Sequence, residues 1–371
     1  MLEKLTSQLV ASRHLTDEQI RFAIEQLTDE KAAATVKADF LTALARKGEI
    51  VEEVAAFARA LRDKSIQPPL DPVTRAREIL DVVGTGGDRL GTFNISTTVA
   101  ILCAAAGVTV AKHGNRAVTS QVGSADVLEA LGIRVDLSPA EAARSLREHG
   151  FAFFFAPNYH PAFKHIAPAR KLCAERGQRT IFNFLGPLLN PARPSAQLVG
   201  VPRPELCEPI ARVLQSLGVR RGMVVSGEVP GAKCQPRKKH RGKVSGSDHA
   251  PRTTHHASLD ELSTLGPNTI AEFYQERGFT VSVLSPEQFP LQPATLDDLR
   301  GGDRAANAEI VRRILRGDER GPKRDAVLLN AAAALFVAGK TKSLAAGWDL
   351  AAETIDSGKA SAKLSELCAD S

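Results

Sequence analysis

The sequence has few cysteines and none of them form a metal-binding pair. Its five cysteines lie far apart in 371 residues, and none belongs to a Cys-x-x-Cys motif. This argues against a disulfide framework and against a structural zinc site. Long apolar runs are also missing, because the least polar stretches, 99–111 and 327–338, are shorter than the ~20 residues that cross a bilayer. The first residues lack the apolar core of a secretory signal, so we expect a cytoplasmic protein that does not enter a membrane.

The net charge of +6 is concentrated in one segment, 228–257. This segment holds seven Lys or Arg residues, two acidic residues and no aromatic residue. Sites for single-stranded nucleic acid combine basic grooves with aromatic rings on which bases stack. A stretch of clustered charge and low hydrophobicity cannot bury enough apolar surface to pack. The segment therefore predicts a basic, disordered insert, and nucleic acid is not the expected partner.

Residues 1 to 70 predict a small helical domain. Thr16 and Gln19 have the spacing of a capping box, and the apolar residues at 20, 23, 24 and 27 share one helical face. Further helical faces follow at 40–44 and 51–61. The proline-rich stretch 68–72 then interrupts the helical pattern. It predicts the boundary with a second domain, 71–371.

In the second domain, short apolar runs alternate with helical patterns. The expected strands are 79–83, 108–111, 151–156, 198–201, 223–225 and 281–284, and the expected helices are 97–106, 125–131, 139–149 and 205–217. Three further helices, 304–315, 325–338 and 342–357, are expected near the end of the chain. This alternation predicts an α/β fold with a mainly parallel sheet flanked by helices on both faces.

The first candidate site is the glycine-rich loop after the expected strand 79–83. Gly84, Gly86 and Gly87 let backbone amides approach an anion closely, and a helix that begins near 94–97 adds the positive end of its dipole. The spacing is neither that of a Walker motif nor Gly-x-Gly-x-x-Gly, and a tight turn without a ligand explains three glycines equally well. Polar side chains at the helix start favour a phosphate site: Thr92, Asn94, Ser96 and Thr97.

A second polar loop, 112–124, follows the next expected strand. It supplies cationic and hydroxyl groups suited to a polyanion: Lys112, Arg116, Thr119, Ser120 and Ser124. Ligands of open α/β sheets bind outside the carboxyl ends of the strands. Two such loops after successive strands therefore predict one shared binding site.

The adjacent carboxylates Asp260 and Glu261 are the third candidate. Mg²⁺ prefers one or two carboxylates together with substrate phosphates. An Asp-Glu pair by itself, however, is typical of a solvated helix start, and the local pattern favours that interpretation.

Taken together, these motifs resemble those of the anthranilate phosphoribosyltransferase family. The similar segments run in order along the chain: Gly84-Thr-Gly-Gly-Asp88, Asn94-Ile-Ser-Thr97, Lys112-His-Gly-Asn-Arg116, Gly123-Ser-Ala-Asp126, Phe155-Ala-Pro-Asn-Tyr-His-Pro161, Pro168-Ala-Arg170, Arg179-Thr180 and Phe182-Asn-Phe-Leu-Gly-Pro-Leu-Leu-Asn-Pro191. The resemblance implies transfer of a phosphoribosyl group from 5-phosphoribosyl 1-diphosphate (PRPP) to the amino group of anthranilate, in tryptophan biosynthesis. It also implies Mg²⁺, a homodimer, a fold like that of nucleoside phosphorylases, and a helical domain completed by part of 165–195.

The resemblance assigns roles to individual positions. The implied PRPP-binding residues are Gly84, Gly87, Asp88, Thr92, Asn94, Ile95, Ser96, Thr97, Lys112, His113, Gly114, Asn115, Arg116, Ala117, Val118, Thr119, Ser120 and Ser124. The implied anthranilate-binding residues are Gly84, His113, Asn115, His160, Arg170, Gly186 and Pro187. The implied metal ligands are Ser96, Asp260 and Glu261. An aromatic amine is already unprotonated at neutral pH, so we expect no catalytic acid or base.

The chain departs from the family pattern at three places. Phe163 stands where an aliphatic residue or methionine is usual, a few extra residues lie within 171–178, and the short loop before Asp260 is expanded into the basic segment. Two alternatives stay open. A pyrimidine nucleoside phosphorylase typically has Lys-His-Ser-Thr-Gly-Gly where this chain has Val82-Val-Gly-Thr-Gly-Gly87. A non-catalytic nucleic-acid-binding relative is the other alternative, suggested by the basic segment.

Overall fold

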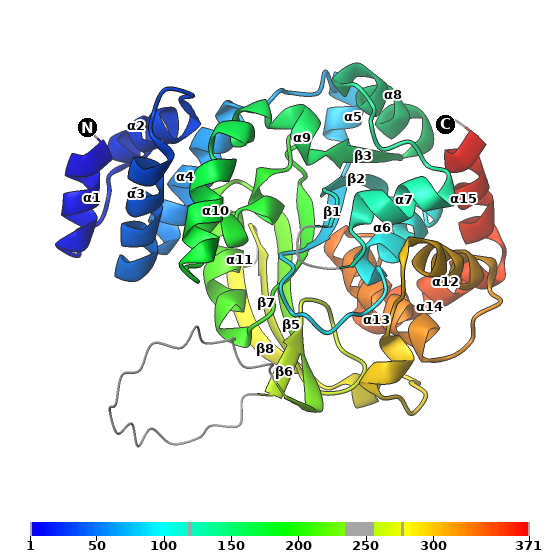
Figure 1. Ribbon diagram of the computed structural model, residues 1–371. Coiled ribbons are helices and arrows are strands. Elements are labelled where there is room, and N and C mark those ends of the chain that lie inside the picture. Colours follow the sequence, from blue (N-terminus) through cyan, green and yellow to red (C-terminus); the bar gives the residue numbers. More distant parts are fainter. Residues whose placement is uncertain (1, 118–120, 234–255, 276–277, 370–371) are drawn as a thin grey trace.

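The computed structural model describes residues 2–117, 121–233, 256–275 and 278–369 (Figure 1). Four helices at the N-terminal side form one end of the molecule: α1 (Leu2–Val10), α2 (Asp17–Thr28), α3 (Ala34–Lys47) and α4 (Val51–Asp63). The capping box at α2 is confirmed, because the Gln19 amide donates to the Thr16 hydroxyl and the Thr16 amide donates to the Gln19 side chain. The helical pattern of the first residues was therefore read correctly.

The rest of the described chain is built around one sheet with the strand order β3-β2-β1-β4-β5-β7-β8, and β6 pairs with β5. The strands are β1 (Ile79–Gly84), β2 (Thr109–Gly114), β3 (Phe151–Phe155), β4 (Ala196–Gly200), β5 (Arg221–Lys233), β6 (His256–Leu259), β7 (Asn268–Tyr274) and β8 (Gly278–Leu284). Strands β3, β2, β1, β4 and β5 run parallel, whereas β6, β7 and β8 are antiparallel to their neighbours. The predicted mainly parallel sheet is confirmed, but the sequence analysis missed β6 and β7.

Helices cover both faces of this sheet (Figure 1). The helices that follow α4 in the chain are α5 (Pro72–Ala76), α6 (Ile95–Ala105), α7 (Ser124–Leu131), α8 (Pro139–His149), α9 (Ala156–Tyr159), α10 (Ala167–Glu175), α11 (Cys207–Ser216), α12 (Arg304–Arg316), α13 (Pro322–Val337), α14 (Leu344–Asp356) and α15 (Lys359–Ala369). Alternate side chains of a strand point to opposite faces. Phe151 and Phe153 of β3 accordingly join the core under α6 and α13, while Ala152 and Phe154 join the core under α8.

The helical end shares its hydrophobic core with the neighbouring part of the sheet. Phe40 and Leu41 of α3 belong to the same cluster as Cys173 of α10, Leu214 of α11 and Val224 of β5. The core is therefore continuous from the first helices, through the segment that contains α10, to one face of the sheet. The domain limits at residue 70 and the completion of the helical domain by part of 165–195 stay predictions.

The predicted disordered insert 228–257 is wrong at both of its ends. Glu228 pairs with Ser258 and Val229 pairs with Ala257, so these residues continue β5 and form β6. Paired strands satisfy their backbone polar groups through each other, which allows order where the side-chain pattern alone predicts none. The most basic part, 234–255, lies outside the described residues.

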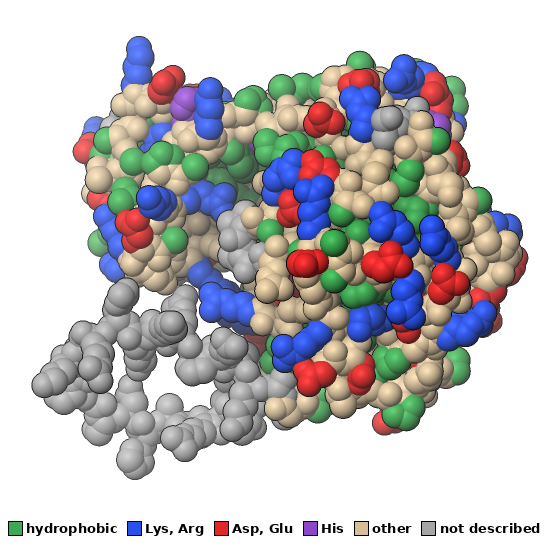
Figure 2. Space-filling view, turned by 45° about the vertical axis from the view of Figure 1, so that its right-hand side comes forward, with side chains coloured by type: hydrophobic (Ala, Val, Ile, Leu, Met, Phe, Trp, Pro, Cys, Tyr) green, Lys and Arg blue, Asp and Glu red, His purple; other side chains and the backbone are tan. Residues whose placement is uncertain are grey.

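Charges are mixed on the face shown in Figure 2. Lys and Arg side chains alternate with Asp and Glu side chains over the larger part of the molecule, without a broad field of one sign. Among the described residues, no helix combines the length and the apolar character that a membrane span requires.

Candidate functional site

The two predicted loops leave neighbouring strands at the same edge of the sheet. β1 ends at Gly84 and β2 ends at Gly114, and the two strands pair in parallel. The expectation that both loops lie together at the carboxyl ends of successive strands is therefore confirmed. This edge is the topological position at which α/β sheets hold their ligands.

The loop after β1 owes its course to backbone conformation. Gly86 and Gly87 have φ values of 73° and 92°, in the left-handed region, and a Cβ at either position would meet nothing within 4 Å. Glycine is required there because side-chain-bearing residues are strained at such φ values, not because space is short. Both glycines are exposed, so their backbone can approach a ligand.

Two other glycines leave the space that Asp260 occupies beside this loop. A Cβ on Gly84 would overlap the Asp260 carboxylate, and one on Gly200 of β4 would overlap the Asp260 backbone. The Gly86 amide donates to Oδ2 of Asp260 at 2.6 Å. The carboxylate of an adjacent residue, Glu261, accepts a hydrogen bond of 3.2 Å from the Ser96 amide in the first turn of α6. The local interpretation of the pair as a solvated helix start is therefore wrong.

The environment of these carboxylates disfavours their negative charge. Burial raises the pKa of Asp260 well above its usual value, and the nearby Asp88 and Glu261 charges raise it further. Burial also raises the pKa of Glu261 to about 7, with the Lys112 ammonium opposing the shift. Like charges held together in a partly enclosed space are stabilised by a cation. Asp260, Glu261 and the Ser96 hydroxyl supply the hard oxygen atoms that Mg²⁺ prefers.

The described chain does not complete a metal site alone. Among the residues that the structure describes, no group of three His, Cys, Asp or Glu side chains is arranged to hold a metal ion. A hard cation at Asp260 and Glu261 would need further oxygen ligands from water or from a bound phosphate.

The two cationic side chains of the second loop bind other groups of the protein. Lys112 is buried, and its ammonium donates to the Val82 carbonyl at 2.7 Å. The Arg116 guanidinium forms an ion pair of 2.6 Å with Glu129 and lies over the Phe155 ring. In the described structure these cations stabilise the sheet edge and the loop.

The other predicted donor-site residues lie around this edge. Asn94 donates to the Val122 carbonyl and accepts from Asn307, whereas Ile95 and Thr97 are buried in the first turn of α6. Thr92 forms a strand bridge with Arg300.

The loop after β2 is held together by Asp126 of α7. The Asp126 carboxylate accepts the amides of Ala117 and Gly123. The Asn115 carbonyl accepts the Ser124 hydroxyl, and Gly114 leaves room for that hydroxyl. Val118, Thr119 and Ser120 lie outside the described residues.

Three of the predicted acceptor residues, His113, His160 and Arg170, lie along a row of aromatic rings. The His113 and His160 rings are 5.5 Å apart, His160 and Phe163 are 5.2 Å apart, and Phe163 and Phe182 are 5.7 Å apart. The Arg170 guanidinium lies 5.5 Å from the Phe182 ring centre. The structure thus brings His113, His160 and Arg170 into one continuous array, with Phe163 in its middle.

Sequence reasoning missed the buried polar residues behind the site. Asn330 of α13 accepts the Leu262 amide and donates to the Leu262 carbonyl, both at 2.9 Å, and so fixes the residue next to Glu261. Asp81 of β1 accepts the His113 amide and the Asn190 side chain. A lone polar residue inside an apolar run was the available signal for both Asn330 and Asp81.

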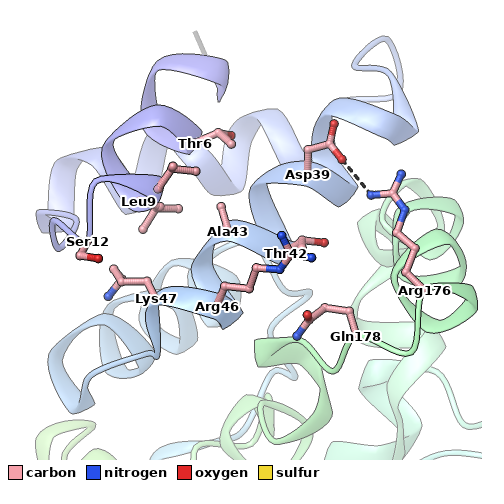
Figure 3. Close-up of a pocket in the computed structure, with 11 residues that line it drawn as sticks. Thr6, Leu9, Ser12, Asp39, Thr42, Ala43, Arg46, Lys47, Arg176 and Gln178 are labelled. Atoms are coloured by element: carbon pink, nitrogen blue, oxygen red, sulfur yellow. Dashed lines mark hydrogen bonds and ion pairs between the residues drawn. The ribbon is translucent and has the colours of Figure 1, made fainter. Parts of the chain in front are cut away.

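A cavity of about 430 Å³ lies elsewhere, on the helical end (Figure 3). Its lining comes from α1, from α3 and from the region of α10, where the Asp39–Arg176 ion pair of 2.8 Å borders it. It contains none of the predicted site residues.

Replacing Asn330 tests whether this side chain holds the backbone beside the Asp260–Glu261 pair in place. In Asn330→Leu, the buried amide and carbonyl of Leu262 lose their partner, so we expect a loss of about 2–4 kcal/mol in the free energy of unfolding. Urea unfolding measures this loss. The exposed Asn183, whose side chain accepts one amide hydrogen bond from Thr180, provides the control Asn183→Leu, for which we expect less than about 1 kcal/mol. Equal losses would contradict the assignment.

The two histidines predict a specific pH dependence. Burial lowers the pKa of His113 to about 3 and that of His160 to about 4. The unfolded chain, with histidine pKa values near 6.5, binds protons in this interval that the folded chain does not, so acidification from pH 7 to pH 5 lowers stability. We expect NMR to find both rings neutral at pH 5.5, and the stability loss to be smaller in His160→Gln. Titration of either ring near pH 6.5 would refute this.

Comparison with known families covers nearly the whole chain. The model of a glycosyl transferase family, a/b domain, matches residues 76–233 and 250–361, and the model of a glycosyl transferase family, helical bundle domain, matches residues 2–65. The two family models follow each other along the chain in the order of the helical end and the sheet.

Individual relatives are similar in sequence and in structure. A curated anthranilate phosphoribosyltransferase of Geobacter sulfurreducens is 44% identical, with 99% of this chain and 98% of the relative aligned. The crystal structure of anthranilate phosphoribosyltransferase from Thermus thermophilus has a TM-score of 0.82 at 39% identity, covering 99% of this chain and 98% of its own. The Saccharomyces cerevisiae enzyme in complex with PRPP and Mg has a TM-score of 0.81 at 25% identity, covering 100% of this chain and 97% of its own. Since both the sequence and the fold agree over this length, the chain belongs to the anthranilate phosphoribosyltransferase family.

Proposed function

We propose that this protein transfers the phosphoribosyl group of PRPP to the amino group of anthranilate, giving N-(5-phosphoribosyl)anthranilate and diphosphate in tryptophan biosynthesis. The observation that carries the proposal is the convergence of the β1 loop, the start of α6 and the Asp260–Glu261 pair at one sheet edge. The family membership and the PRPP and Mg complex of the yeast relative support the same reaction.

The β1 loop and the start of α6 would hold the diphosphate of the donor. The exposed backbone around Gly86 and Gly87, together with the positive end of α6, suits a polyanion. As the bond to the ribose breaks, negative charge grows on the leaving diphosphate. Fixed amide donors stabilise that charge without reorganising during the reaction. The predicted contacts of Asp88, Thr92 and Ser124 belong to this donor site.

The metal ligands in this proposal are Asp260, Glu261 and the Ser96 hydroxyl. Their partly enclosed, mutually repelling charges are the observation that fits a divalent cation. When bound, Mg²⁺ would neutralise part of the charge of the leaving diphosphate. The role of the chain is to present the two carboxylates beside the loop that holds the same phosphates.

Anthranilate would bind on the aromatic array beyond β2. The guanidinium of Arg170 lies at the outer end of this array and is suited to the anthranilate carboxylate. Asn115, exposed at the loop after β2, lies on the donor side. Gly84, Gly186 and Pro187 are the remaining predicted acceptor residues. Orientation of the amine toward the ribose then supplies a large part of the rate enhancement.

The proposal needs no catalytic acid or base, because the amine of anthranilate attacks without first losing a proton. The low pKa values of His113 and His160 keep both rings neutral at pH 7. They act as uncharged walls of the acceptor site. The homodimer and the cytoplasmic location implied by the resemblance stay predictions.

Anthranilate fluorescence tests the reaction directly. We expect the fluorescence to fall when PRPP, Mg²⁺ and the protein are present together, and to stay constant when any one of them is omitted. Product analysis must detect equal amounts of diphosphate and N-(5-phosphoribosyl)anthranilate. Phosphate-dependent cleavage of a pyrimidine nucleoside without this reaction would favour the phosphorylase alternative.

Neutral replacement of the acidic pair tests the metal assignment. We expect Asp260→Asn combined with Glu261→Gln to lower kcat/KM by about a hundredfold or more, since charge stabilisation at the leaving group is lost. The matched control changes an exposed Asp-Glu pair, Asp17→Asn with Glu18→Gln, in the first turn of α2. Activity of the first variant equal to that of this control would place the metal ligands elsewhere.

A further inference from the structure

Three consecutive backbone carbonyls of one short turn are each bound by a side chain from a different element. The turn is the 3₁₀ segment η3 (Gly186–Leu189). The Leu189 carbonyl accepts a hydrogen bond of 3.1 Å from Nε2 of His160, just after α9. The backbone of Gly186, at the start of the turn, interacts with the His113 ring of β2 and opposes the lowering of that ring's pKa by burial. The turn therefore takes its position from outside itself.

The other two carbonyls, those of Pro187 and Leu188, are bound by residues that the sequence analysis did not single out. Nε2 of Gln197, on β4, donates to the Pro187 carbonyl at 3.1 Å. Nε of Arg62, on α4, donates to the Leu188 carbonyl at 2.5 Å. Both side chains are buried, so each bond is made away from bulk water, where an unpaired carbonyl is costly.

Arg62 is an unusual residue to find at this place. It is 6% exposed, and burial lowers the pKa of its guanidinium to about 10, which still leaves it charged at pH 7. The negative charge of Asp81 offsets part of that cost. Its Nη2 atom has no hydrogen-bond partner among the described residues. Burying a charged guanidinium with an unpaired donor costs free energy, so apolar packing alone does not explain this residue. Its hydrogen bond to Leu188 points instead to a role in holding the turn.

The end of the turn is anchored as well. The Asn190 side chain donates to Asp81 at 2.9 Å and to the Ala111 carbonyl at 2.8 Å. Asp81 also accepts the amide of His113. The same buried carboxylate therefore fixes both the end of η3 and the backbone of β2 that carries His113.

We infer that His113, His160, Gln197 and Arg62 form a clamp that positions Gly186 and Pro187 for anthranilate, with Arg62 linking the helical end of the molecule to the acceptor site. This inference rests on the proposed function, because it assigns the clamp to the acceptor and not to the donor. Arg62 and Gln197 are positioning residues: they contact the turn, and the turn contacts the substrate.

The clamp predicts a selective effect on one of the two substrates. Removing one buried hydrogen bond to η3 should displace the acceptor surface and leave the β1 loop and the start of α6 unchanged. We expect Arg62→Gln to raise KM for anthranilate about tenfold, the factor that corresponds to ~1.4 kcal/mol, while KM for PRPP stays within about twofold. Arg59→Gln is the matched control, because Arg59 lies one turn earlier on α4 and pairs with Asp17 at the exposed surface.

A second variant changes the hydrogen bond that the turn receives from strand β4. Gln197→Met removes the donor to Pro187 with little change of volume, and we expect the same selective rise in KM for anthranilate. This variant decides the matter if Arg62→Gln does not fold. Hydrogen exchange of the amides at 186 and 188–190, which needs no turnover, should be faster in either variant than in the wild type.

The outcomes separate the clamp from the reaction. Absence of wild-type turnover would refute the proposed function, whereas hydrogen exchange would still report on the clamp. A folded Arg62→Gln with both KM values and the exchange rates of the Arg59→Gln control would overturn the inference. Equal rises in KM for both substrates would also overturn it, since they would indicate a general structural role.

Discussion

Asp260 lies in a space that two glycines leave open, and the geometry of the site depends on this fit. Any side chain at Gly84 or Gly200 would occupy the volume of Asp260. The contact joins the ends of β1 and β4 to the residues after β6. It places Asp260 where the Gly86 amide binds it and where Glu261 reaches the first turn of α6. Negative charge is thereby gathered beside a loop suited to phosphates, an arrangement that is favourable with a cation between them.

Buried polar side chains hold the rest of the site through the backbone. Asn330 binds both polar groups of Leu262, Asp126 binds two amides of the loop after β2, and Arg62 binds the carbonyl of Leu188. Such bonds fix loops that have no regular secondary structure to satisfy their polar groups. The loops of this site are therefore positioned by helices and strands around them, which is how preorganised binding sites are built.

The sequence predicted the parallel strands, the helical end and the two loops at one sheet edge, because hydrophobic periodicity and glycine-rich turns are local signals. It did not predict β6 and β7, since β6 begins within the charged segment. The local pattern around Asp260 favoured a solvated helix start, and only the family resemblance pointed to a metal site. Arg62 and Gln197 were not singled out, because their partners in η3 are backbone carbonyls that no side-chain pattern marks. The contact between Arg62 and Leu188 spans 126 positions.

The central claim is that the Asp260–Glu261 pair and the β1 loop together bind one metal-bound sugar diphosphate. Isothermal titration calorimetry of PRPP with the wild-type protein, with and without Mg²⁺, tests it most directly. The account predicts saturable binding with one PRPP per chain in the presence of Mg²⁺, and binding weaker by at least about tenfold without it. Equal affinity under both conditions, or no binding under either, would contradict it.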